Sequence, residues 1–76
     1  MKLLQEEFEH PTQASLVRLR VFPQGPGFLA TEERQGASTV YRTLGLFDTR
    51  EAAEARVRAR AGQLQAQRYR KAQPAA

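Results

Sequence analysis

Few side chains in this sequence have the chemistry of a catalytic or metal-binding group. The chain has one histidine, His10, one aspartate, Asp48, and no cysteine. His10 is followed by Pro11, and this pair is typical of an exposed turn rather than of a catalytic base. Asp48 stands at the start of a predicted helix, where a carboxylate caps the backbone amides. A metal site needs several ligands of these types, so we predict none.

The other polar residues do not complete a catalytic site either. Glu32 and Glu33 are neighbours in a predicted strand, so their carboxylates point to opposite faces and cannot work as a pair. Ser15 and Ser38 have no base near them in the sequence, although a nucleophilic hydroxyl requires one. We therefore predict that the protein is not an enzyme and uses no cofactor or small-molecule substrate.

Arginine is the residue type that stands out. The net charge of +4 is uneven, because residues 1–35 carry four basic and five acidic groups, whereas residues 36–76 carry eight and three. The planar guanidinium matches phosphate and carboxylate groups. A basic half attracts nucleic acid, an anionic membrane surface or an acidic protein surface. A solvated helix face that keeps a small domain soluble explains the same charge.

Three predicted strands position several of these arginines. Residues 15–22 alternate between apolar and polar side chains, which predicts a half-buried strand with Arg18 and Arg20 on its polar face. Its apolar face consists of Val17, Leu19 and Val21.

Two further strands are predicted at residues 28–34 and 39–47. Pro and Gly residues at 23–27 predict a turn that no strand passes through. Gly45 interrupts the last strand and indicates a bulge or a close approach of the helix backbone. Because the connections are short, we expect an antiparallel meander.

A long helix follows, from Thr49 to about Ala72. Asp48 and Glu51 have the spacing of a capping box. The apolar stripe of the helix is narrow and rich in alanine. It fades beyond Leu64, so the last two turns are expected to project into solvent or onto a partner. The stripe consists of Ala53, Val57, Ala61 and Leu64.

Residues 1–14 are a lead-in with two open interpretations. Leu4 and Phe8 are four residues apart, which suits a short helix that ends at His10, and suits equally a loose tail that packs on the sheet. The predicted fold is α+β, a three-stranded antiparallel sheet followed by one long C-terminal helix (β-β-β-α). It forms a single domain at residues 15–73, with a tail at 74–76.

The composition also indicates in which compartment of the cell the protein is located. No apolar run approaches the roughly 18 residues that a membrane span requires. The first residues become acidic at once, which is unlike a secretory signal or a transit peptide. With no cysteine, the cytoplasm is the expected location, and no membrane is expected as a partner.

Parts of this sequence resemble two groups of small sheet-plus-helix domains. The segment LGLFDTREAAEA, residues 44–55, resembles a strand-to-helix junction in the arm-binding domain of phage-type integrases and in the plant ethylene-response DNA-binding domain. Those domains lay a three-stranded sheet in the major groove of DNA. The resemblance implies a similar sheet with a helix behind it.

Residues 16–69 also resemble the WGR domain, which occurs in small bacterial proteins and poly(ADP-ribose) polymerases and is named for a Trp-Gly-Arg triplet. Residues 33–36 stand at the signature, Phe47 ends the third strand, and the basic residues 68–71 close the helix. The chain departs from the signature because it has no Trp. The resemblance implies nucleic-acid binding, with Arg34 and the helix-end arginines at positions where those domains are basic.

The first functional hypothesis is a small nucleic-acid-binding domain that uses a basic sheet face and a basic helix end. Arg18 and Arg20 on one sheet face are its main support, and pairing of these arginines with Glu32 or Glu33 would neutralise that face. The predicted binding residues are Arg18, Arg20, Arg34, Arg42, Arg68, Arg70 and Lys71.

The alternative is a protein-interaction or accessory module without a nucleic-acid role, such as a homodimer, a subunit of a larger complex or the partner of an acidic protein. A single sheet has one face to cover, and another chain covers it readily. In this alternative the contact residues are Phe8, Phe28, Leu64 and Tyr69, unless the N-terminal segment folds over the sheet and completes the core.

Overall fold

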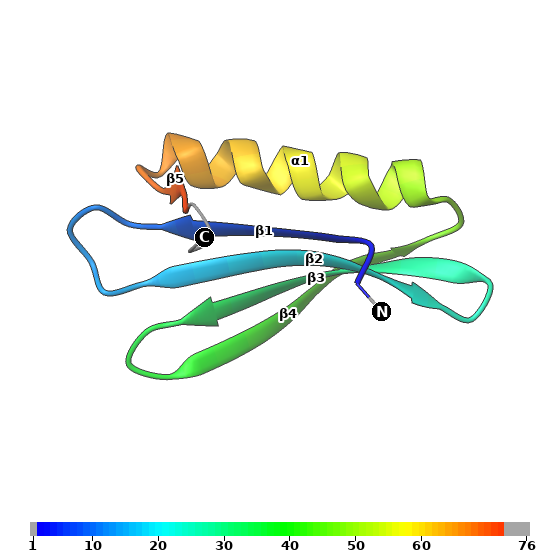
Figure 1. The fold of residues 1–76 in the computed structure, drawn as a ribbon, viewed down its shortest axis with the longest axis horizontal. Coiled ribbons are helices and arrows are strands. Elements are labelled where there is room, and N and C mark those ends of the chain that lie inside the picture. The colour runs from blue at the N-terminus through cyan, green and yellow to red at the C-terminus, as the bar shows by residue number, and fades with distance from the viewer. Residues whose placement is uncertain (1, 73–76) are drawn as a thin grey trace.

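The computed structural model describes residues 2–72. The helix α1 lies across one face of the sheet, and within these residues no helix covers the other face (Figure 1). The strand order is β4-β3-β2-β1-β5, and all paired strands are antiparallel. The elements are β1 (Leu4–Glu9), β2 (Leu16–Gln24), β3 (Gly27–Gln35), β4 (Thr39–Phe47), α1 (Arg50–Ala66) and β5 (Arg70–Lys71).

The expected three-stranded sheet is wrong, because the sheet has five strands. One additional strand is β1, which lies in the segment expected to be a short helix or a loose tail. Leu4 is opposite Val21 and Phe8 is opposite Val17, so both apolar side chains of β1 face α1. Residues 4–9 are therefore part of the domain that was expected to begin at residue 15.

The second additional strand is β5, which follows the helix. The helix ends at Ala66 and does not continue to residue 72 as expected. Arg68 adopts a left-handed backbone with φ of 74°, which reverses the chain. Tyr69 then enters the core, with only 8% of its surface exposed, and β5 pairs with β1. Residue 73 and the expected tail at 74–76 lie outside the described residues.

The turn expected at residues 23–27 is shorter than predicted. Gln24 is paired with Gly27, so β2 and β3 are joined by a two-residue turn in which Gly25 has φ of 55°. Pro23 is tolerated in β2 because the pairing of β2 with β1 stops at Val21, and beyond it β2 has only β3 as a neighbour.

A β-bulge interrupts β4, as Gly45 indicated. Ala30 is opposite Gly45 and Thr31 is opposite Thr43, so Leu44 is the additional residue. A Cβ atom at Gly45 would lie 2.8 Å from the ring of Phe47, which explains the glycine. The regular part of β4 therefore ends at Thr43.

The core lies between α1 and the sheet. The predicted apolar face of β2 is confirmed, since its three residues are fully buried. Small Ala53 and the two larger residues Val57 and Leu64 bring the helix close to this face. The buried apolar residues are Phe8, Val17, Leu19, Val21, Ala30, Ala53, Val57, Leu64 and Tyr69.

The helix begins one residue later than the predicted capping box requires. Thr49 is the N-cap, and its Oγ1 accepts a hydrogen bond of 3.1 Å from the amide of Ala52. The residue three positions after the cap is thus Ala52, not Glu51, so no capping box forms. Asp48 is exposed and precedes the cap.

Substitution of the cap is the direct test of this helix start. We expect Thr49→Ala to lower the free energy of unfolding by about 1 kcal/mol, because one amide of the first turn loses its partner. Asp48→Ala is the matched control, and its effect should stay within about 0.5 kcal/mol. Urea denaturation followed by circular dichroism measures both. A larger loss for Asp48→Ala than for Thr49→Ala would place the cap at Asp48 instead.

Candidate functional site

The open face of the sheet, opposite α1, is neutralised by ion pairs. Arg18 lies 3.1 Å from Glu7 and 3.3 Å from Glu33, and Arg20 lies 3.1 Å from Glu33. The Glu33 side chain is only 7% exposed beneath the two arginines. The arginines of β2 therefore pair with carboxylates of the neighbouring strands. Arg18 and Arg20, two of the predicted binding residues, are already in ion pairs.

A second ion pair is buried on the opposite face, under the helix. Arg60 of α1 donates from Nε to Oε1 of Glu32 at 2.6 Å and from Nη2 to Oε2 at 3.3 Å. Glu32 is 4% exposed and Arg60 is 9% exposed. The hydrogen bond to Glu32 raises the pKa of Arg60 above its ordinary value, so its guanidinium stays charged although it is buried.

A groove opens beside this pair, between the second half of α1 and the first half of β4. The β3–β4 hairpin diverges from α1 towards its turn (Figure 1). The hollow has a volume of about 310 Å³. We call it the arginine groove, and it is lined by Glu32, Arg34, Val40, Arg42 and Arg60.

Positive charge exceeds negative charge in the arginine groove. Three arginines line the groove, Arg34, Arg42 and Arg60, against one carboxylate, that of Glu32. This carboxylate is already hydrogen-bonded to Arg60. Arg42 is opposite Glu32 in the β3–β4 register, yet among residues 2–72 it forms no ion pair. Arg56 is half-buried one helical turn before Arg60, on the same flank of α1.

Arg34 has an unused donor in the groove. Its Nη2 lies 3.5 Å from Glu32, and its guanidinium lies over the ring of Tyr69, 6.0 Å from the ring centre. Its Nε atom is buried and has no hydrogen-bond partner in the described part of the chain. A buried donor without a partner is unfavourable, and the Arg34 guanidinium meets the groove through its exposed part instead.

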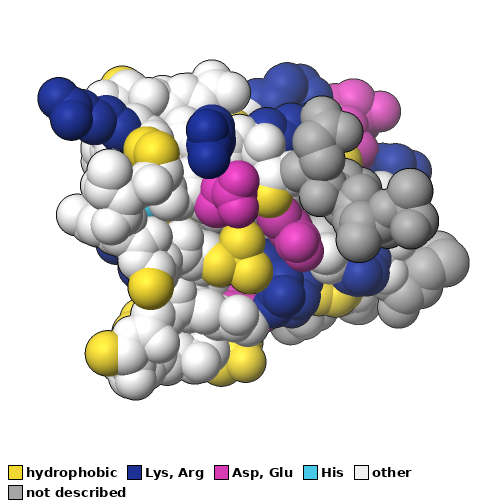
Figure 2. Space-filling view, turned by 60° about the vertical axis from the view of Figure 1, so that its left-hand side comes forward, with side chains coloured by type: hydrophobic (Ala, Val, Ile, Leu, Met, Phe, Trp, Pro, Cys, Tyr) yellow, Lys and Arg dark blue, Asp and Glu magenta, His cyan; other side chains and the backbone are white. Residues whose placement is uncertain are grey.

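The basic residues that follow the helix lie elsewhere. β5 pairs with β1, at the edge of the sheet opposite β4. Arg70 lies 3.6 Å from Glu9, and Lys71 lies 3.3 Å from Glu6. Acidic side chains are interspersed with basic ones on the surface that Figure 2 shows.

The seven predicted binding residues thus fall into three groups. Arg18 and Arg20 are paired on the open face, and Arg34 and Arg42 face the groove. The third group, after the helix, consists of Arg68, Arg70 and Lys71, all exposed.

The residues of the alternative hypothesis belong to the core. Phe8 and Leu64 are buried, Tyr69 is 8% exposed, and Phe28 is half-buried against the core. The N-terminal segment completes the core as β1, and Phe8, Leu64 and Tyr69 are buried within the domain.

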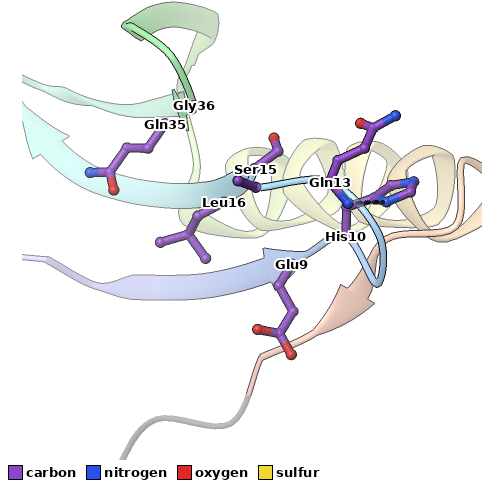
Figure 3. Close-up of a pocket in the computed structure, with 8 residues that line it drawn as sticks. Glu9, His10, Gln13, Ser15, Leu16, Gln35 and Gly36 are labelled. Atoms are coloured by element: carbon purple, nitrogen blue, oxygen red, sulfur yellow. Dashed lines mark hydrogen bonds between the residues drawn. The ribbon is translucent and has the colours of Figure 1, made fainter.

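Another hollow holds the one histidine of the sequence. It has a volume of about 470 Å³ and lies between the β1–β2 loop and the end of β3 (Figure 3). His10 is half-buried with its ring 5.2 Å from that of Tyr69, contrary to the exposed turn expected.

The side chains of His10 and Ser15 form hydrogen bonds that stabilise the local fold. His10 Nδ1 accepts from the amides of Thr12 and Gln13, each at 3.2 Å. Ser15 Oγ shares a hydrogen bond of 3.0 Å with the hydroxyl of Tyr69. No hydrogen bond joins the Ser15 and His10 side chains within residues 2–72, so a nucleophile and a base are not brought together.

Sequence reasoning missed Arg60 as a site residue. It was counted among the basic residues, but the predicted apolar stripe contained Ala61 in its place. The signal available was the spacing, because Arg60 is three residues after Val57 and four before Leu64, on the buried face.

Two kinds of feature are absent from the described residues. In the part of the chain that the structure describes, no three His, Asp or Glu residues are grouped so as to hold a metal ion. Within residues 2–72 no helix is both long enough and apolar enough to span a membrane.

Comparison with protein-family models, curated proteins and solved structures found no match to this chain.

Proposed function

We propose that this chain is a non-enzymatic, cytoplasmic domain that binds nucleic acid through the arginine groove. The observation that carries the proposal is the excess of guanidinium groups over carboxylates in this groove, where Arg42 is exposed and forms no ion pair among residues 2–72. Guanidinium groups bind phosphate oxygens through paired hydrogen bonds. The proposal moves the binding surface from the open face of the sheet, where Arg18 and Arg20 are occupied, to the groove behind β4.

The shape of the groove favours a polymer over a small anion. The hollow is at the sheet edge, with Arg56 continuing the basic surface along α1 and Val40, 55% exposed, between the arginines. Apolar surface of this kind contacts sugars and base edges, while the guanidiniums hold phosphates. The resemblance to WGR-type domains implies nucleic-acid binding, which agrees with this proposed role.

Binding should depend steeply on salt. If Arg34, Arg42 and Arg56 neutralise three phosphates, the affinity for duplex DNA should fall about 40-fold between about 50 mM and about 200 mM salt. Fluorescence anisotropy with labelled duplex DNA, single-stranded DNA and RNA measures this dependence. Absence of binding to all three polymers at the lower salt concentration would contradict the proposal.

Arg42→Ala tests the groove itself. Because one phosphate contact is lost, we expect weaker binding and a salt dependence that drops to about 12-fold over the same range. Arg58→Ala is the matched control, since its side chain is 66% exposed and points away from the sheet. An equal loss for both variants would indicate a diffuse charge effect rather than a site in the groove.

A further inference from the structure

The exposed apolar side chains of this domain are concentrated on one strand. Among residues 2–72, the large hydrophobic residues with high exposure are Val40 at 55%, Tyr41 at 72% and Leu46 at 63%. All three belong to β4, which is an edge strand. The pleat places Val40 on the helix side and Tyr41 on the open side, so apolar surface flanks the free edge on both faces.

The two edges of the sheet differ in their protection. At the β1 edge, β5 pairs with Phe8 and Glu9, and its side chains form ion pairs with Glu9 and Glu6. No strand of the described chain pairs with the outer side of β4. Its nine residues include one charge, Arg42, and no Pro or Lys. Exposed edges that stay unpaired usually carry such residues, so β4 is suited to pairing with another strand.

The regular part of β4 is symmetric about one residue. It runs from Thr39, after the β3–β4 turn, to Thr43, before the bulge, and its midpoint is Tyr41. If two copies pair antiparallel about this midpoint, Tyr41 faces Tyr41 of the second copy and Thr39 faces Thr43. On the helix side Val40 faces the aliphatic stem of Arg42. No like charges are directly opposite, and aromatic and Thr–Thr pairs are favourable across strands.

We propose that the protein self-associates through β4, with a two-fold axis at Tyr41 that joins two five-stranded sheets into one. A second copy satisfies the backbone groups of the edge and covers both apolar faces at once, which a polyanion does not. A C₂ contact of this kind uses the same surface on both partners and closes without forming fibres. Val40 and Arg42 also line the arginine groove, so dimerisation and the proposed nucleic-acid binding share these two side chains.

Sedimentation velocity over about 1 µM to about 1 mM protein tests the association. The mass is expected to rise from 8.6 kDa towards twice that value. Tyr41→Lys places two positive charges opposite each other at the axis, so the dissociation constant should rise about tenfold or more. Gln65→Lys adds the same charge on the exposed face of α1 and should leave dimerisation unchanged.

A cysteine at the axis tests the pairing independently of affinity. The chain has no cysteine, so Tyr41→Cys introduces a single thiol. Opposed residues in a two-fold strand pair are close enough for a disulfide, and we expect rapid formation of a covalent dimer under mild oxidation. Gln65→Cys is the control and should form covalent dimer at least about tenfold more slowly.

Three outcomes would overturn the inference. They are a wild-type protein that stays monomeric at the highest concentration, a dimer that Tyr41→Lys leaves intact, and equal cross-linking of the two cysteine variants. Because Tyr41 is 72% exposed, its substitutions should preserve the fold, and thermal melting followed by circular dichroism verifies this.

Discussion

Arg60→Ala is expected to lower the free energy of unfolding by about 3 kcal/mol, because it breaks a buried ion pair. The loss arises from Glu32, which is 4% exposed and would lose its bidentate partner. Arg34 lies 3.5 Å from the same carboxylate and compensates in part, so the expected value is at the lower end for a broken buried pair.

The pair itself is not expected to be worth this amount. Desolvation of two charges offsets much of their attraction, so apolar residues of similar size replace a buried pair at little net change. The double variant Glu32→Leu with Arg60→Met should therefore unfold within about 1 kcal/mol of the wild type.

Urea denaturation separates these cases. The chain has no Trp, so far-UV circular dichroism is the suitable signal. A loss below about 1 kcal/mol for Arg60→Ala would mean that Arg34 or water satisfies Glu32 fully. A double variant as unstable as the single one would mean that the loss is a packing defect at residue 60, not an unpaired carboxylate.

The glutamates of this pair show what the sequence could predict. Glu32 and Glu33 are adjacent in the strand predicted at 28–34, and their opposite orientation was deduced correctly from the pleat. Each carboxylate meets arginine on its own face, Glu32 under the helix and Glu33 on the open side. Which arginine each one meets depends on the strand register and on the helix position, and these are tertiary properties.

The N-terminal segment shows why one strand was not predicted. Leu4 and Phe8 are four residues apart, and this spacing puts side chains on one face in a helix and also in a strand. The pattern alone therefore does not separate the two. The decision comes from β2, which offers β1 a partner along Leu16–Val21.

The last strand was hidden for a different reason. The residues after Ala66 are good helix formers, and the left-handed turn falls on Arg68 rather than on a glycine. Burial of Tyr69 and two pairs with β1 favour this reversal, and neither leaves a local signature in the sequence. Three strands and the body of the helix could be predicted because alternation and helix propensity are local.

Phe8→Ala is expected to have the largest effect on stability, about 3 to 5 kcal/mol. Phe8 is 1% exposed and lies in β1 between Val17 of β2 and Lys71 of β5. Its removal leaves a cavity where the strand, the helix end and the C-terminal segment meet. A domain of this length has a total stability of roughly 4 to 11 kcal/mol, so much of it would be lost.

Thermal melting followed by circular dichroism measures this loss. For a domain of this size, each 1 kcal/mol shifts the melting temperature by about 4 to 8 °C, so Phe8→Ala should melt at least about 12 °C below the wild type. Leu46→Ala also truncates a large apolar side chain in a strand, but this one is 63% exposed, and its melting temperature should change little. Equal melting temperatures for Phe8→Ala and the wild type would mean that residues 4–9 are a loose tail and that the core closes without β1.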